Sequence, residues 1–348
     1  MSVSGALPQW LGGDSAIRSD ASLYFLIFSL FLPILQMNFL AAGMLRCSGN
    51  MRIPSIAGVL MCILDVVFNF FLIFPSREFS AGGLTLSIPG AGLGVQGAAL
   101  GTGLAESVAA AITLWYLFTR SSGLKIKAWR KSPSLPTPPI VRNSIRISLP
   151  MGLEHVVICG AQIMTTVIVA PLGIPAIAAN SFAITAESLC YMPGYGIADA
   201  ATTLVGQSLG AGRRRLTRRF AYITVFMGMA VMGIMGIVMY IFAPQIIGTM
   251  TPVEEIRRLG IMALRIEAFA EPMFAAAIIS YGVFVGAANT LVPSLMNFFS
   301  IWAVRISLAA WLAPTMGLKG VWVAMCAELC FRGIIFLIRL RGKQWMKI

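Results

Sequence analysis

Carboxylates inside long apolar runs are the residues of this chain whose chemistry stands out. A charged side chain at the centre of a membrane-spanning helix costs roughly 2.5–3.5 kcal/mol on insertion scales, so it usually has a partner or a role. Such a group can bind a proton or a cation and release it when its surroundings change. Eight acidic residues lie in apolar runs: Asp65, Glu106, Glu154, Glu187, Asp199, Glu267, Glu271 and Glu328.

Glu154 follows Pro150 by one helical turn near the start of an apolar run. The proline removes a backbone donor and loosens the helix locally. We therefore predict that Glu154 binds a proton or a cation. Gln162, about two turns further along the same face, is predicted to contact a bound small molecule. The alternative is that Glu154 pairs with a basic group at the membrane interface.

Two further pairs have i, i+4 spacing, which places both members on one helix face. Asp65 and Asn69 are predicted to coordinate a cation or to join a proton network, with a polar clasp between helices as the alternative. Glu267 and Glu271 repel each other, so one of them would tend to hold a proton. The alternative for Glu267 is a pairing with Arg265.

A proline-glycine step interrupts the run that contains Glu187 and Asp199. Pro193 and Gly194 predict a kinked or discontinuous helix there. Broken helices near the membrane midplane are where transporters build their binding sites. We predict that Asp199, Tyr191 and Tyr195 contact a ligand, since aromatic faces attract cations. Simple packing of the two tyrosines is the alternative.

The composition indicates a membrane protein. The chain is 58% hydrophobic and only 11% charged, with a mean hydropathy of +0.84. A soluble domain needs more charged surface than this. Although the net charge is +13, the basic residues cluster in short segments between apolar runs, which argues against nucleic-acid binding. One histidine and six cysteines without metal-ligand spacing predict no metal, no organic cofactor and no enzyme active site.

The apolar runs predict an all-α, polytopic membrane protein with about nine transmembrane helices. Each run reaches about 20 residues, enough to cross the hydrocarbon core of a bilayer. The predicted spans are 21–45, 53–75, 96–119, 146–171, 175–208, 217–243, 259–286, 291–313 and 319–339. Basic segments at 120–146, 213–219 and the C-terminal tail predict the cytoplasmic side. The chain is thus expected in the plasma (inner) membrane as a multi-pass protein.

An internal repeat predicts two related lobes. Residues 47–55 (CSGNMRIPS) resemble residues 286–294 (GAANTLVPS), and such duplication is typical of transporters. Within its own lobe, the second copy has about three apolar runs before it, whereas the first copy has only one. We therefore expect an incomplete first lobe at 1–119, a cytoplasmic linker at 120–145 and a six-helix second lobe at 146–348.

Five motifs in order resemble the multidrug and toxic compound extrusion family. The stretch LVGQSLGAG at 204–212 is typical of that family, and Ala178–Asn180 and Met192–Gly196 precede it at the familiar distance. GNMRIP at 49–54 and GAANTLVP at 286–293 follow the family's paired glycine-to-proline pattern. The resemblance covers the chain from about residue 11.

The resemblance implies a secondary antiporter for multidrug efflux. It would export xenobiotic or cationic amphiphilic compounds in exchange for H⁺ or Na⁺, with no other cofactor. Glu154 matches a carboxylate of the family's second lobe, and Asp65 and Asn69 match an acid–amide pair in swapped order. The family's usual acid in the second lobe's fourth helix is Phe274 here, and Glu271 lies one turn away.

The expected partners are the lipid bilayer and small, organic, cationic substrates, whereas the oligomeric state stays open. The residues expected to contact substrate are Gln162, Asn180, Tyr191, Tyr195 and Asp199. Two alternatives remain. A lipid-linked saccharide flippase of a related superfamily would need a large cationic cavity, yet few buried arginines are expected beyond Arg265 and Arg305. A non-transporting, truncated remnant would share every motif.

Overall fold

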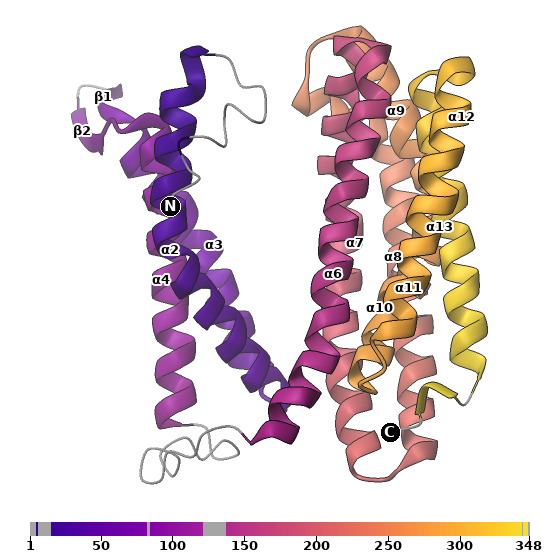
Figure 1. Cartoon of the computed structure of the whole chain (residues 1–348). Coiled ribbons are helices and arrows are strands. Elements are labelled where there is room, and N and C mark those ends of the chain that lie inside the picture. The colour runs from indigo at the N-terminus through magenta and orange to yellow at the C-terminus, as the bar shows by residue number, and fades with distance from the viewer. Residues whose placement is uncertain (1–4, 6–14, 82–83, 121–136, 343, 347–348) are drawn as a thin grey trace. The chain divides into compact units, whose positions relative to one another are not determined.

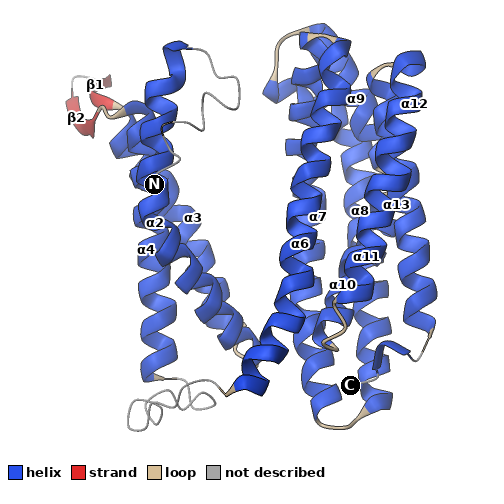
Figure 2. Ribbon diagram, viewed as in Figure 1, coloured by secondary structure: helices blue, strands red, loops and turns tan. Residues whose placement is uncertain are grey.

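The structure is a computed structural model that describes residue 5 and residues 15–81, 84–120, 137–342 and 344–346. The chain divides into two compact units, Met1–Leu135 and Pro136–Ile348. Helices make up almost all of the described part of both units (Figure 2). This confirms the predicted all-α class.

The described part of the first unit holds three long helices and a small hairpin (Figure 1). Its elements are α2 (Ser15–Cys47), α3 (Arg52–Ile73), β1 (Pro75–Ala81), β2 (Leu84–Ala91) and α4 (Gly94–Thr119). Helix α4 packs against both α2 and α3. Glycines on α4 permit this close approach, because a Cβ atom on Gly101 would collide with the side chain of Asn69.

The hairpin was not predicted from the sequence. Strands β1 and β2 pair antiparallel, with Ala81 opposite Leu84 (Figure 2). The signal in the sequence is the pair Gly82-Gly83 between two short runs, a composition typical of a two-residue hairpin turn. These two glycines lie outside the described residues.

The second unit is a helical bundle (Figure 1). Its long elements are α6 (Pro138–Val169), α7 (Ile174–Gly210), α8 (Arg214–Met250), α9 (Glu254–Glu267), α10 (Glu271–Gly286), α11 (Leu291–Phe299), α12 (Ser307–Met316) and α13 (Leu318–Arg341). Three short segments complete it: η1 (Ala170–Leu172), the π-helical η2 (Ser300–Ile306) and η3 (Gln344–Met346).

The number of apolar spans is lower than predicted. Among the described residues, seven helices are long and apolar enough to cross a membrane, and the pair α9–α10, bent by 60°, raises the number to eight. The predicted fifth span is α7, which is long enough but carries Asn180, Glu187 and Asp199 and does not reach the same hydropathy. Helix α7 also continues without a break through Pro193. The broken helix of this unit is therefore α9–α10.

The C-terminal part of the predicted linker at 120–145 belongs to helix α6. Residues 121–136 lie outside the described residues. Helix α6 begins at Pro138, eight residues before the predicted start of its span at 146. Pro138 and Pro139 occupy the first turn of α6, where a missing backbone donor costs no hydrogen bond.

Small residues let α7 and α10 approach closely in the core of the second unit. The two helices are in extensive contact. A Cβ atom on Gly282 would lie 2.6 Å from the backbone oxygen of Ala198. Thr202 adds a direct link, since its hydroxyl donates to the carbonyl oxygen of Gly282 at 2.8 Å. Both helices contribute side chains to the cavities described below, so this contact sets the spacing of the cavity walls.

Gly282→Ala is therefore expected to destabilise the second unit by about 1–3 kcal/mol, since the new methyl group meets backbone that cannot rotate away. Thermal unfolding in detergent micelles measures the effect. The matched control is Gly196→Ala in α7, where a Cβ atom would meet open space. That variant should melt no lower than the wild type. Equal melting temperatures for the two variants would contradict the close approach.

Candidate functional site

Glu154 is held by three neutral donors from two other helices. The side chain projects from α6 and is only 7% exposed. The hydroxyl groups of Tyr281 on α10 and Ser294 on α11 donate to Glu154 Oε2, each at 2.5 Å. Asn297 Nδ2, also on α11, donates to Glu154 Oε1 at 2.5 Å. All three hydrogen-bond partners are uncharged, and no hydrogen bond between Glu154 and a basic side chain occurs in the described part of the chain.

This arrangement suits reversible binding of a proton or a cation. A buried carboxylate that is satisfied by neutral hydrogen bonds keeps its position without a fixed positive charge. Tyrosine and serine hydroxyls can rotate, so they can donate to the carboxylate or accept from a proton or cation bound to it. A permanent arginine or lysine partner would block that exchange.

A cavity of about 270 Å³ opens beside Glu154. Its walls include Asp199 and Tyr195 from α7 and Tyr281 from α10. The structure thus places the predicted coupling residue Glu154 and the predicted substrate residue Asp199 in one cavity of the second unit. His155, the only histidine of the chain, lines the same cavity.

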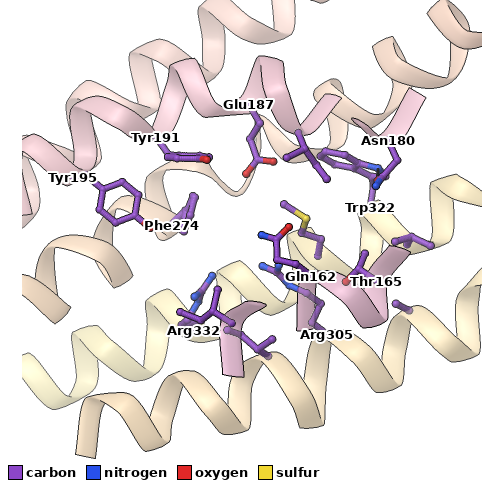
Figure 3. A pocket seen from close by; sticks show the side chains of 16 residues that line it. Gln162, Thr165, Asn180, Glu187, Tyr191, Tyr195, Phe274, Arg305, Trp322 and Arg332 are labelled. Carbon is purple, nitrogen blue, oxygen red and sulfur yellow. Dashed lines mark hydrogen bonds between the residues drawn. The ribbon is translucent and has the colours of Figure 1, made fainter. Parts of the chain in front are cut away.

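A second cavity, of about 150 Å³, brings together the other four residues predicted to contact a substrate (Figure 3). These are Gln162, Asn180, Tyr191 and Tyr195. Asn180 is anchored, because Trp322 Nε1 donates to its Oδ1 at 3.1 Å. Aromatic contacts fix Tyr191, whose ring centroid lies 5.7 Å from that of Tyr195 and 5.8 Å from that of Phe274.

The two cavities share part of their lining. Ile158, Tyr195, Phe274 and Arg332 border both of them. The guanidinium carbon of Arg332 lies 5.4 Å from the centre of the Phe274 ring. This aromatic–cation pair is therefore the partition between the cavity beside Glu154 and the cavity that contains Asn180.

Arg305, Glu328 and Arg332 form a buried charge cluster that was not predicted from the sequence. Arg305 donates to Glu328 Oε2 from Nε at 3.0 Å and from Nη2 at 2.7 Å. Arg332 Nε lies 3.1 Å from Glu328 Oε1. The side chain of Glu328 is fully buried. Burial of Arg332 was not predicted, although its position inside an apolar run of the sequence could have indicated it.

The π-helical segment η2 explains part of this cluster. Ser300 donates to Glu328 Oε1 at 2.5 Å, and Arg305 binds the other oxygen. Because a π-helix bonds each residue to the fifth one along, it turns residues five apart toward one side. Ser300 and Arg305 therefore reach the same carboxylate. A regular α-helix would direct them apart.

Glu267 and Glu271 lie at the break between α9 and α10, and neither lines either cavity. Both residues are 0% exposed. Their four carboxyl oxygens have no hydrogen-bond partner in the described part of the chain. The predicted alternative partner, Arg265, stacks instead on Tyr240, with its guanidinium carbon 5.3 Å from the ring centre. The two acids therefore lie on two helices that meet at a 60° bend and not on one helix face as the spacing predicted.

Asp65 and Asn69 belong to the first unit. Asn69 Nδ2 donates to Asp65 Oδ1 at 3.1 Å along α3. A separate contact joins α2 and α4, where Asn38 donates to Glu106 Oε2 at 3.1 Å and accepts from Thr113 at 2.8 Å. The Asn69–Asp65 bond lies within one helix, whereas the contact of Asn38 with Glu106 and Thr113 is a polar clasp between helices. Cation coordination by Asp65 and Asn69 stays a prediction.

No group of three or more His, Cys, Asp or Glu side chains with metal-binding geometry occurs among the described residues. A cation that binds beside Glu154 would meet carboxylate, hydroxyl and amide oxygens. Such hard oxygen ligands suit a proton or an alkali cation better than a transition metal.

Comparisons with known proteins point to one family. A family model described as MatE matches residues 150–311. The probable multidrug resistance protein NorM of Thermotoga maritima is 26% identical over 313 residues, which cover 88% of this chain and 63% of that protein. The protein of the same name from Idiomarina loihiensis is 24% identical over 342 residues, covering 95% of this chain and 71% of its own length. The chain thus spans less than two thirds of the Thermotoga relative.

Solved structures share the fold. A crystal structure of a mutant of the Vibrio cholerae MATE transporter VcmN matches 99% of this chain and 75% of that protein, with a TM-score of 0.84 and 17% identity. An outward-facing multidrug resistance MATE family transporter matches 97% of this chain and 72% of its own, with a TM-score of 0.85 and 19% identity.

Proposed function

Because this chain belongs to the MatE family of multi-pass membrane transporters, we propose that it exports small organic compounds in exchange for protons or sodium ions. Glu154 carries the ion in this proposal. The single observation that supports it best is the buried Glu154 carboxylate, which is hydrogen-bonded to the neutral side chains of Tyr281, Ser294 and Asn297. A carboxylate with an exchangeable counterion at a cavity wall is what antiport requires.

The neighbouring cavity offers the place for the exported compound. Gln162, Asn180, Tyr191 and Tyr195 line it, and Asp199 lines the cavity beside Glu154. Antiport needs the two ligands to affect each other, which requires a shared two-state element between their sites. The partition formed by Phe274 and Arg332 borders both cavities and supports such a coupling.

The flippase alternative is less well supported. A pyrophosphate needs a large cavity with a strong excess of positive charge. Arg305 and Arg332 do line the smaller cavity, but its volume is only about 150 Å³ and Glu187 lines it with them. Glu328 neutralises a further part of the positive charge. These features favour a small organic substrate.

Transport driven by an imposed ion gradient tests the proposal. The purified chain is reconstituted into liposomes, and ethidium movement is followed by fluorescence under a proton gradient alone and a sodium gradient alone. We expect one gradient to accelerate ethidium movement above that in protein-free liposomes and the other to leave it unchanged. Acceleration by neither gradient would refute the proposed antiport.

A further inference from the structure

A basic pocket lies at one end of the second unit, where α8 begins and α13 ends (Figure 1). Its volume is about 910 Å³, and it shares no lining residue with the two cavities described above. Among the described residues, four arginines line it: Arg215, Arg218 and Arg219 from α8 and Arg341 from α13. Two segments far apart in the sequence therefore bring four guanidinium groups to one depression of the surface.

This pocket has no acidic lining residue in the described part of the chain. The sequence contains no aspartate or glutamate between residues 200 and 253 or after Glu328. None of the four arginines forms an ion pair with a described acid. Like charges held at one surface repel one another, and an anion that binds between them removes this repulsion. The pocket therefore favours an anionic partner from outside the chain.

Aromatic contacts hold part of the pocket in place. Arg218 lies over the ring of Tyr222, with its guanidinium carbon 5.4 Å from the ring centre, and its Nη2 donates to the Tyr222 hydroxyl at 3.3 Å. The Tyr222 ring stacks in turn on Phe226, with ring centroids 6.4 Å apart. Both rings line the pocket. An arginine fixed in this way loses less side-chain freedom when its planar group binds two oxygens of one phosphate.

Apolar side chains continue from the arginines along the outer faces of both helices. Ile223 and Phe226 on α8 and Ile338 on α13 are each more than half exposed. Ile223 and Ile338 lie about one helical turn from Arg219 and Arg341. In a chain whose helices cross a membrane, exposed apolar side chains contact the acyl chains of lipids. A ligand of the pocket thus meets positive charge with hydrocarbon-facing surface beside it, which is the arrangement that a phospholipid requires.

We propose that this pocket binds the headgroup of a phospholipid with two phosphates, the chemistry of cardiolipin, on the side of the membrane that the basic segments predict to be cytoplasmic. One phosphate can accept paired hydrogen bonds from two guanidinium groups, so four arginines match two phosphates. Basic pockets between membrane helices suit such headgroups. A free phosphate would leave the apolar surface beside the pocket uncovered. The inference goes beyond the proposed export function and does not depend on it.

Native mass spectrometry of the purified chain measures lipid binding, because each bound lipid adds a separate mass. The chain in non-ionic detergent is titrated with cardiolipin, phosphatidylglycerol and phosphatidylcholine, which carry two, one and no net negative charges. We expect cardiolipin to bind at least about tenfold more tightly than phosphatidylglycerol. Phosphatidylcholine should bind most weakly, since its choline group repels the arginines.

Matched variants separate the pocket from the overall charge of its segment. Arg218→Gln and Arg341→Gln each remove one pocket arginine and should lower cardiolipin affinity about fivefold, the effect of one basic residue near a lipid surface. Arg214→Gln removes the same charge one position from Arg215, but Arg214 does not line the pocket. Its affinity should change by less than about twofold, because water and salt screen an exposed charge. None of the three side chains is buried, so unchanged melting temperatures without lipid show that the variants are folded.

Equal affinities for cardiolipin and phosphatidylglycerol would overturn the inference. Equal losses in Arg214→Gln and Arg218→Gln would also overturn it, since the net charge of the segment would then be the attraction. Competition with inorganic phosphate at constant ionic strength identifies the source of the anion. Excess inorganic phosphate should leave cardiolipin bound, whereas release of cardiolipin would indicate a site for free phosphate instead. These measurements need no ion gradient, so their outcome is independent of the transport assay.

Discussion

Glu154→Gln is expected to reduce gradient-driven transport to the level of protein-free liposomes. Glutamine has nearly the same shape and can still accept hydrogen bonds from Tyr281 and Ser294. It cannot exchange a proton or hold a cation by charge, so the step that couples ion movement to substrate movement is lost. Initial rates of ethidium movement, normalised to the amount of reconstituted protein, measure the effect.

Two variants make this result specific. Glu255→Gln alters an exposed acid in the first turn of α9 and should leave transport unchanged. Glu154→Asp keeps the charge but shortens the side chain by one methylene, so it cannot keep all three partners at hydrogen-bonding distance and should retain part of the rate. Wild-type rates in Glu154→Gln would remove Glu154 from the coupling role.

Glu328→Gln is expected to be among the most destabilising substitutions in the second unit. It removes the one carboxylate shared by Arg305 and Arg332 and leaves two positive charges buried without a counterion. Breaking a buried ion pair from one side costs about 3–5 kcal/mol. Thermal unfolding in detergent and the yield of monodisperse protein measure this loss.

The chain offers a matched comparison for that effect. Glu254 forms an ion pair with Arg257 at 3.2 Å, but its side chain is 85% exposed. Exposed pairs contribute at most about 1 kcal/mol, since water solvates each charge when the pair is broken. Glu254→Gln should therefore melt close to the wild type. If both substitutions lowered stability equally, burial of the Glu328 cluster would not be the cause.

The buried acids Glu154, Glu187 and Glu328 differ in the groups that surround them. Within the described part of the chain, Glu154 accepts hydrogen bonds from neutral side chains, Glu328 pairs with two arginines, and Glu187 lines a cavity. A permanent pair such as that of Glu328 resists exchange and orders its surroundings. A carboxylate with neutral partners or at a cavity wall remains available to a ligand. The three environments therefore support a structural role for Glu328 and binding roles for Glu154 and Glu187.

The sequence by itself determined the class of the protein and the positions of its helices. Hydropathy is a property of consecutive residues, so the apolar runs marked helices such as α3 and α8 to within several residues. The acids within those runs were equally visible, because burying a charge is costly wherever the helix packs. Glu154 stood out for this reason before any of its neighbours was known.

Only the tertiary structure decided which of these groups meet. The partners of Glu154 lie 127, 140 and 143 residues away in the sequence, and their approach depends on how α6, α10 and α11 are rotated about their axes. The pairing of Arg305 with Glu328 depends on the π-helical turn of η2, which no local pattern indicated, whereas Arg332 and Glu328 lie four residues apart on α13. Side-chain contacts between helices depend on which face of each helix packs against its neighbour. The hydropathy of an apolar run does not indicate how its helix is rotated about its own axis.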